Sequence, residues 1–316
     1  MARRIEHGGP RARRRSTSVR VVLGLALAFA PLARATAAPA TAAPATALVN
    51  PTANIAPRPN IFSSGPCRST GKALTCANPC LASGPGVGAH SARCARFTLE
   101  AINNARARLD ERPLVLPSNW TSLSVPEQLF VIVDLQRVSA GYPAYLGLNA
   151  ALSREAQRAA NARRDPGIAP GFAIGHNPAG QPGFDGAWAM GSSVLAADYV
   201  WMYEDGWGGS ARATPNRLCT GPGVWACWSH RDELLGSATS PSAGVGLGCS
   251  TCAMGAGFAP GGGGSLVALI ERPAGQPPAM TFTWGNELAY FPVASSSPPT
   301  TTSVPPAPST PGRPGK

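Results

Sequence analysis

Apolar side chains recur every three to four residues in three stretches of the first half of the chain, which predicts three helices. In the first stretch Leu99, Ile102 and Leu109 fall close to one stripe. The second has a broad apolar face and begins with a capping box, in which Ser124 is the cap and Glu127 the third residue. The three helices are expected at residues 97–109, 124–140 and 150–163.

A fourth helix is expected at residues 192–205. The same spacing places four of its residues on one face, namely Val194, Ala197, Trp201 and Glu204. A carboxylate on an apolar face is costly unless it is paired, hydrogen bonded or bound to a cation. Glu204 is therefore a candidate functional residue.

The last third of the chain has short apolar or alternating runs separated by Gly and Pro turns, which are typical of strands in one antiparallel sheet. The runs are GVGLGC, MGAGFAP, SLVALIER and MTFTW. Between helices and strands, residues 169–187 are rich in glycine and are expected to be a long loop that presents His176. With helices first and strands last, the predicted fold class is α+β.

The two ends of the chain differ in composition from its middle. Seven arginines lie before an apolar run at residues 21–33, and Ala35-Thr36-Ala37 supplies small residues for cleavage, so residues 1–37 are expected to be a secretory signal peptide. No later stretch reaches the roughly 18 apolar residues of a membrane span. The remaining expected parts are an Ala/Pro-rich spacer (38–66), a Cys-rich extension (67–96), a folded domain (97–292) and a disordered Pro/Ser/Thr-rich tail (293–316).

The signal peptide also accounts for most of the positive charge. Eight of the 27 Lys and Arg residues and one of the 16 acidic residues lie in residues 1–37, so the formal net charge of +11 falls to +4 after cleavage. No basic run with interleaved aromatic residues is left in the mature chain. A role in nucleic-acid binding is therefore not expected.

The cysteines are even in number and all fall in the expected mature chain, which in an exported protein favours disulfides over free thiols. Cys249-Ser250-Thr251-Cys252 also fits a redox or zinc motif, but a single CxxC without a second is weak evidence for either. The spacing favours a local bridge from Cys219 to Cys227, and the other pairings stay open. The eight candidates are Cys67, Cys76, Cys80, Cys94, Cys219, Cys227, Cys249 and Cys252.

Two histidines could partner Glu204, because His176 and His230 lie at comparable distances before and after it in the chain. If the three side chains converge, they line a cavity, and all three are of types that act as acids or bases or bind metal ions. Trp201 and Arg231 would support it, with Arg231 pairing to an acidic neighbour. The alternative is that Glu204 turns to the helix edge and the histidines have no functional role.

Several motifs, taken in order, resemble the CAP superfamily, which contains cysteine-rich secretory proteins, venom allergens and plant pathogenesis-related proteins. They are LQRVSAGYPAYLGLNAALSREAQRAA, IGHN with His176, WMYE ending at Glu204, SHRDELL with His230, and GVGLGCS. The similarity covers roughly residues 97–288 and is closest to an exported actinobacterial type. It implies a three-layer α-β-α sandwich with a small, mainly antiparallel sheet stabilised by disulfides.

The chain departs from the family pattern at the second cavity carboxylate. Where members commonly have Glu-Asn-Ile/Leu, this chain has Gly186-Ala187-Trp188-Ala189-Met190-Gly191, and Asp185 is the nearest acid that could substitute. Two neutral imidazoles and one carboxylate can still hold Zn²⁺ with an open position. Zinc is therefore an expected cofactor only if His176, Glu204 and His230 meet.

Three functions follow from these observations. The first is an exported, non-catalytic binding module for a small apolar ligand, an envelope component or a protein partner. The second is a hydrolase acting on peptide or cell-wall polymer, with a metal-bound water or Glu204 as general base, although no GxSxG or HExxH motif is present. The third is a purely structural exported domain.

Overall fold

The computed structural model describes residues 50–292 apart from short gaps, and all described residues belong to the unit that begins at Ala42. The predicted signal peptide, the start of the spacer and the tail lie outside the described residues. The gaps are 72, 168, 174, 177–181, 184, 191–192, 209–218, 222–223, 225, 237–248, 250, 261–264 and 277–278.

The helices predicted from apolar spacing are present, and each begins at a polar cap that accepts a backbone hydrogen bond. They are α1 (Ala92–Ala107), α2 (Val125–Ser139), α3 (Ala150–Ala162) and α4 (Val194–Tyr199). Their caps are Ser91, Ser124, Asn149 and Ser193, and Ser124 forms the predicted capping box with Glu127. Further helical elements are η1 (Trp120–Ser122), α5 (Ser229–Leu235), α6 (Trp284–Glu287) and η3 (Leu288–Tyr290).

The helix expected at residues 192–205 changes its geometry midway. After α4 the chain continues as a π-helical turn, η2 (Val200–Glu204), and every α4 residue is buried. The four residues expected on one apolar face are buried, and the residues on the other side of α4 are buried as well, because that side is also covered. π-helical turns are frequent at functional sites.

The covering segment is residues 50–61, which we call the strap and which the sequence assigned to the spacer. The Ile55 N–H donates to the Tyr203 carbonyl at 2.9 Å, and the Tyr199 hydroxyl donates to the Ile55 carbonyl at 2.7 Å. Ile55 and Ile61 belong to the main hydrophobic core. Two isolated isoleucines in a Pro-rich stretch show no periodicity, so only the tertiary contacts identify the strap.

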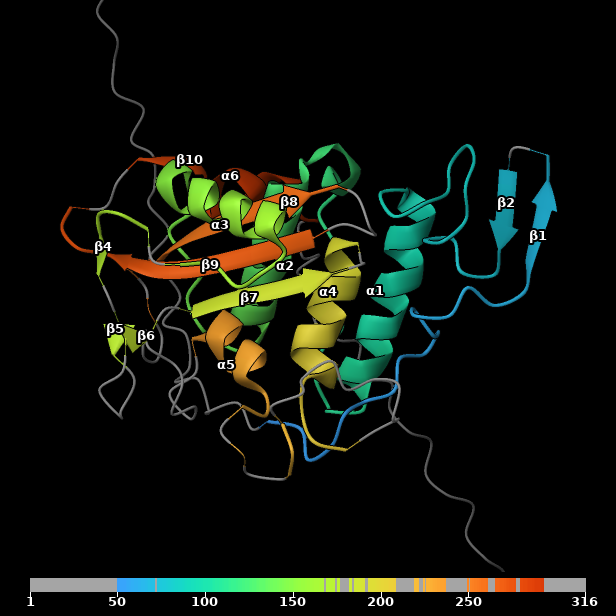
Figure 1. Ribbon diagram of the computed structural model, residues 1–316, viewed down its shortest axis with the longest axis horizontal. Helices are drawn as coiled ribbons and strands as arrows, with labels where there is room; N and C mark the ends of the chain where they lie inside the picture. Colours follow the sequence, from blue (N-terminus) through green and yellow to red (C-terminus); the bar gives the residue numbers. More distant parts are fainter. Residues whose placement is uncertain are drawn as a thin grey trace, which may run out of the picture. The chain divides into compact units, whose positions relative to one another are not determined.

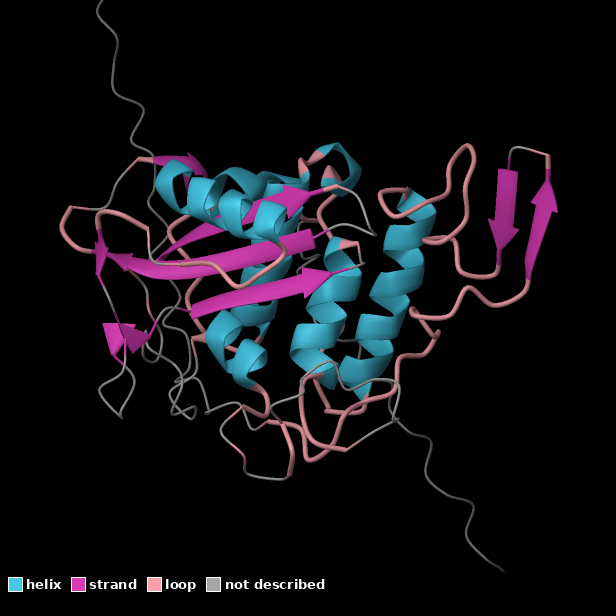
Figure 2. Cartoon of the chain, viewed as in Figure 1, coloured by secondary structure: helices cyan, strands magenta, loops and turns pink. Residues whose placement is uncertain are grey.

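The main sheet is mixed, and Figures 1 and 2 show its long strands β7, β8 and β9 side by side. Its described strands run in the order β10-β3-β8-β9-β4, with β7 also paired to β9, and β3 is parallel to β8 while the other pairs are antiparallel. The expectation of one antiparallel sheet was therefore wrong in detail, although the α+β class is confirmed. The strands are β3 (Leu148–Asn149), β4 (Phe172–Ala173), β7 (Asp185–Met190), β8 (Ala253–Ala259), β9 (Ser265–Pro273) and β10 (Met280–Phe282).

The glycine-rich stretch expected to be a loop instead contains strands. β4 and β7 join the main sheet through β9, and β5 (Gly175–His176) pairs with β6 (Pro182–Gly183). Glycine and proline made this stretch look unstructured, but pairing along the whole of β7 with β9 supplies the backbone hydrogen bonds that fix it as a strand. Of the predicted strands, residues 244–248 lie outside the described residues.

Helices pack on both faces of the sheet. Met254 and Ala256 of β8 belong to the large core formed with α1, α2, α4 and α5, whereas the intervening positions face α3. A Cβ on Gly255 would lie 2.2 Å from the Leu152 backbone, and one on Gly257 would lie 2.3 Å from the Ala156 backbone. The two glycines therefore let α3 lie directly on the strand, as Figure 1 shows.

All eight cysteines form disulfides, as predicted, and the Cys219–Cys227 bridge is confirmed. The pairs are Cys67–Cys76, Cys80–Cys94, Cys219–Cys227 and Cys249–Cys252. The first closes a hairpin of β1 (Cys67–Thr70) and β2 (Ala73–Cys76), and the second ties the Cys-rich extension to α1. Four disulfides fit an extracellular protein.

Among the described residues, none of the helices combines the length and the apolar character that crossing a membrane requires.

The close approach of α3 to β8 predicts that Gly257→Val is strongly destabilising. We expect a loss of about 3 kcal/mol in the free energy of unfolding, because the new side chain would collide with backbone atoms that cannot rotate away. Urea unfolding followed by circular dichroism measures it. Gly275→Ala is the matched control, since a Cβ there meets nothing within 4 Å, and an equal loss in both variants would contradict the packing.

Candidate functional site

His230 is paired with Asp205, and this pair is the centre of the candidate site. The imidazole Nδ1 lies 2.5 Å from Asp205 Oδ2. The His230 side chain is 26% exposed whereas that of Asp205 is 1% exposed. A buried carboxylate thus orients an imidazole that solvent can reach, and no described residue forms a hydrogen bond to the other ring nitrogen.

The backbone around the pair is tightly held. Trp228 N–H donates to the Asp205 carbonyl at 2.8 Å, and Trp228 has a left-handed φ of 64° that turns the chain into α5. A Cβ on Gly206 would lie 2.1 Å from the Trp228 indole ring. Only glycine fits between Asp205 and this ring, so the turn after η2 and the start of α5 pack as one unit.

The pair determines the charge of the imidazole. Burial lowers the pKa of His230, but the Asp205 carboxylate outweighs burial, with help from Glu233 and Asp165, and raises the pKa to about 9. The ring is therefore protonated at neutral pH. The ion pair contributes stability below the unfolded value of about 6.5, and this stability is lost as the pH rises through 9.

Glu204 is inside the protein, as its position on the apolar face predicted. It is 0% exposed, and among the described residues neither carboxylate oxygen has a hydrogen-bond partner. Burial raises the pKa of Glu204 to about 8. The carboxyl group is therefore largely protonated at neutral pH, which removes the cost of a buried charge.

Trp201 lies beside the pair, as the sequence suggested. Its ring centroid is 6.5 Å from that of His230, and its indole N–H donates to the Trp188 carbonyl at 3.3 Å. This bond joins η2 to β7 of the main sheet. Trp201 thus supplies an apolar wall next to the imidazole and fixes η2 against the sheet.

Arg231 supports the site from a different network than predicted. It was expected to pair with Asp232, Glu233 or Glu204, but its guanidinium donates to Glu111 Oε1 at 3.1 Å and to the Met202 carbonyl at 2.8 Å. Glu111 lies 120 residues earlier in the chain, and no local pattern distinguishes it from the acidic neighbours of Arg231.

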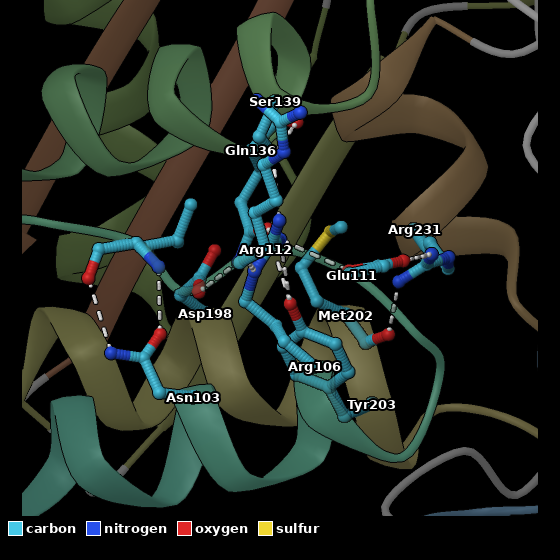
Figure 3. Close-up of polar contacts among 11 residues, drawn as sticks. Asn103, Arg106, Glu111, Arg112, Gln136, Ser139, Asp198, Met202, Tyr203 and Arg231 are labelled. Carbon is cyan, nitrogen blue, oxygen red and sulfur yellow. Dashed lines mark hydrogen bonds and ion pairs between the residues drawn. The ribbon is translucent and has the colours of Figure 1, made fainter. Parts of the chain in front are cut away.

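Glu111 also pairs with Arg106 of α1, and Figure 3 shows the resulting network. Arg106 Nη1 lies 3.0 Å from Glu111 Oε2 and donates to Gln136 of α2 at 2.8 Å and to the Tyr203 hydroxyl at 3.3 Å. Gln136 in turn donates to Asp198 of α4 at 2.8 Å. Side chains from α1, α2, α4, η2 and α5 thus meet in one buried polar cluster, none of which the apolar periodicity indicated.

The other end of α5 is held by α2. Arg137 donates to the Leu235 carbonyl, and its guanidinium lies 3.7 Å from the centroid of the Tyr145 ring. The Tyr145 hydroxyl donates to the Leu234 carbonyl at 3.0 Å. A cation at the last carbonyls of a helix is favourable, so these contacts fix the short helix that carries His230.

The predicted convergence with His176 is not tested, because the side chains of His176 and Asp185 lie outside the described residues. The backbone places His176 in β5 and Asp185 at the start of β7. Among the described residues, no three His, Cys, Asp or Glu side chains lie close enough together to hold a metal ion. The described part of the site therefore does not fit zinc by itself.

Asp205 is the functional residue that the sequence reasoning missed. It follows Glu204 directly, and the helical spacing favours Glu204 rather than Asp205 as the acid on the apolar face. The change to π-helical geometry in η2 shifts the last residues of the helix relative to the expected face. The sequence does contain one signal for Asp205, which is its position next to Gly206 at the end of the expected helix. A side chain at a helix end can turn away from the helical face and reach another element.

A separate groove of about 400 Å³ lies between α1 and the segment that follows it. Its walls are mainly apolar, with Leu99, Val115, Leu116 and Trp120 among them, and Arg96 is its one charged lining residue. None of its lining residues belongs to the His230 site.

Models of known protein families, curated proteins and solved structures give no significant match to this chain. The similarity to the CAP superfamily therefore stays a prediction from the motifs.

The first prediction from this geometry concerns the charge of His230. Asp205→Asn keeps a hydrogen-bond acceptor but removes the charge that outweighs burial, so the pKa of His230 is expected to fall from about 9 to below 6.5. NMR titration of the imidazole signals measures it. Asp110→Asn, at an exposed position, is the control, and an unchanged value in Asp205→Asn would show that the pair does not form.

The second prediction concerns the effect of Glu204 on the free energy of unfolding at different pH values. Because its pKa is raised from 4.5 to about 8, the folded state retains a proton that the unfolded state has lost, and between these values stability falls as the pH rises. Glu204→Gln removes this loss, so its free energy of unfolding relative to the native protein should improve by up to about 1.4 kcal/mol per pH unit across that window. Urea unfolding at pH 5, 6, 7 and 8 measures the difference.

The exposed Glu100→Gln is the control for the replacement of a carboxyl group by an amide. A difference between Glu204→Gln and the native protein that stays constant from pH 5 to 8 would refute the assignment.

Proposed function

We propose that this chain is an exported binding protein of the CAP type, which holds a small ligand at the His230 site without converting it. In this proposal residues 1–37 are a signal peptide and the folded part is a three-layer α-β-α sandwich. The four disulfides support export. Helices on both faces of the sheet support the sandwich.

The observation that carries the proposal is the Asp205–His230 pair. An imidazolium donates hydrogen bonds and accepts none, so it suits a carboxylate or carbonyl oxygen of a ligand. It suits neither the role of general base nor that of metal ligand, because both require the neutral ring. Trp201 beside the ring offers apolar contact to the rest of such a ligand. An apolar molecule with an acidic head group is the ligand class that these contacts favour.

A hydrolase is the alternative, and the raised pKa of Glu204 is the observation in its favour, since a base near neutral pH is what general-base catalysis needs. The burial of Glu204 argues against it, because a carboxylate with 0% exposure has no contact with a substrate from solvent. The pairing of His230 with Asp205 argues against His230 as the base as well, because the ring is protonated at neutral pH.

A titration of the full mature chain with palmitate, an apolar carboxylate, tests the proposal by calorimetry. We expect measurable binding that His230→Gln weakens by about tenfold, because the charged donor is lost. Val115→Glu, in the groove beside α1, is the control and should leave the affinity unchanged. If Val115→Glu weakens palmitate binding and His230→Gln does not, palmitate binds in the groove beside α1, which contradicts the proposal.

Turnover is measured on the same preparation with peptide, ester and glycan substrates. The proposal expects none. Hydrolysis that disappears in His230→Ala would establish the enzyme instead. Absence of both palmitate binding and turnover would leave the purely structural reading as the better account.

A further inference from the structure

We infer that Asn54 and Asn50 of the strap are positioning residues, which hold the two elements that carry the Asp205–His230 pair at the right separation. The strap precedes the predicted domain in the sequence. The role of the pair as a ligand contact rests on the proposed function. The positioning of the pair by the strap does not, because its geometry does not involve the ligand.

The first point of attachment is the turn that carries Asp205. Asn54 Oδ1 accepts a hydrogen bond from the Gly206 N–H at 2.8 Å, and Asn54 is only 8% exposed. The next residue, Ile55, bonds to Tyr203 and Tyr199 on the same helical segment. The strap therefore binds the chain on both sides of Asp205, at Tyr203 in η2 and at Gly206 in the turn that follows it.

The second point of attachment is the helix that carries His230. The Asn50 side-chain amide donates to both oxygens of Asp232, at 3.1 and 3.3 Å. Asp232 lies two residues after His230 and is 3% exposed. Within five residues the strap thus contacts both elements that the pair joins.

The two contacts matter because the pair is short-ranged. A side-chain hydrogen bond is lost once its donor and acceptor are more than about 3.5 Å apart, and the bonds between the two elements set the separation of the Asp205–His230 pair. Trp228 N–H to the Asp205 carbonyl and Arg231 to the Met202 carbonyl are two of these. Loss of an asparagine is therefore expected to loosen the pair without separating it completely.

The strap side chains act on the imidazole only through this geometry. The charged groups that affect His230 are Asp205, Glu233 and Asp165, and none of them changes when an asparagine is replaced by alanine. A change in the titration of His230 would therefore report on its distance from Asp205, which a general loss of stability would not alter.

NMR titration of His230 in the full mature chain tests the inference with Asn54→Ala and Asn50→Ala. We expect the pKa of His230 to fall from about 9 toward the ordinary value of about 6.5 in both, with the larger fall in Asn54→Ala, whose partner is next to Asp205. Asn54→Asp retains the acceptor for Gly206 and should keep the pKa at or above that of the native protein.

Asn149→Ala is the matched control, because Asn149 is also buried and accepts from backbone amides, those of Ala151 at 2.8 Å and Leu152 at 3.2 Å, at the start of α3. It should lower stability but leave the titration of His230 unchanged. The native pKa in both strap variants, or an equal fall in the control, would overturn the inference. If Asn54→Ala does not fold, Asn50→Ala and Asn54→Asp decide the result.

The experiment separates the two proposals. A fall in the pKa of His230 in a protein that binds no palmitate supports the positioning role and rejects the proposed ligand class. Palmitate binding by a protein in which both strap variants leave the pKa of His230 unchanged supports the proposed ligand class and rejects the positioning role.

Discussion

The rest of the site depends on one carboxylate shared by two buried arginines. Glu111 bonds to Arg106 from α1 and to Arg231 from α5 (Figure 3). The side chains of the two arginines are only 3% and 1% exposed. A buried cation is costly unless it is paired, and removing the shared partner would leave two unpaired charges. The bonds of Arg106 to Gln136 and Tyr203 extend the constraint to α2 and η2. The last turn of η2 and the first turn of α5 are thereby held in register.

This constraint explains how a single histidine comes to have a defined charge and direction. Arg231 is the residue after His230, so anchoring its guanidinium to Glu111 and Met202 fixes the start of α5. Asp205 at the end of η2 then meets the imidazole, and its charge outweighs the effect of burial. Glu204, one residue earlier, has no such partner among the described residues, and burial raises its pKa. Neighbouring acids therefore acquire opposite properties, one pairing with a cation and the other favouring the neutral form, because the chain turns between them.

The features of the site that depend on residues close together in the chain were predicted from the sequence, and those that depend on distant residues were not. The capping box of Ser124 and Glu127 acts within four residues and was predicted correctly. Glu204 was correctly placed inside the protein, and Trp201 lies beside His230 as suggested. The partner of Arg231 was wrong because Glu111 is 120 residues away. Asp205 was missed because the π-helical turn alters the helix geometry, which apolar spacing does not reveal.

The sequence by itself determined the parts whose physics is local or compositional: the four longer helices, the capping box at Ser124, the apolar strands after residue 250, the even set of cysteines and the α+β class. Only the tertiary structure decided that β7 joins the sheet, that β3 runs parallel to β8, that the strap covers η2, and that Asp205 pairs with His230. The reason is that a helix or a cap is stabilised by neighbours within one or two turns. Strand pairing and buried ion pairs depend on groups far apart in the chain, whose meeting is fixed only when the whole core has packed.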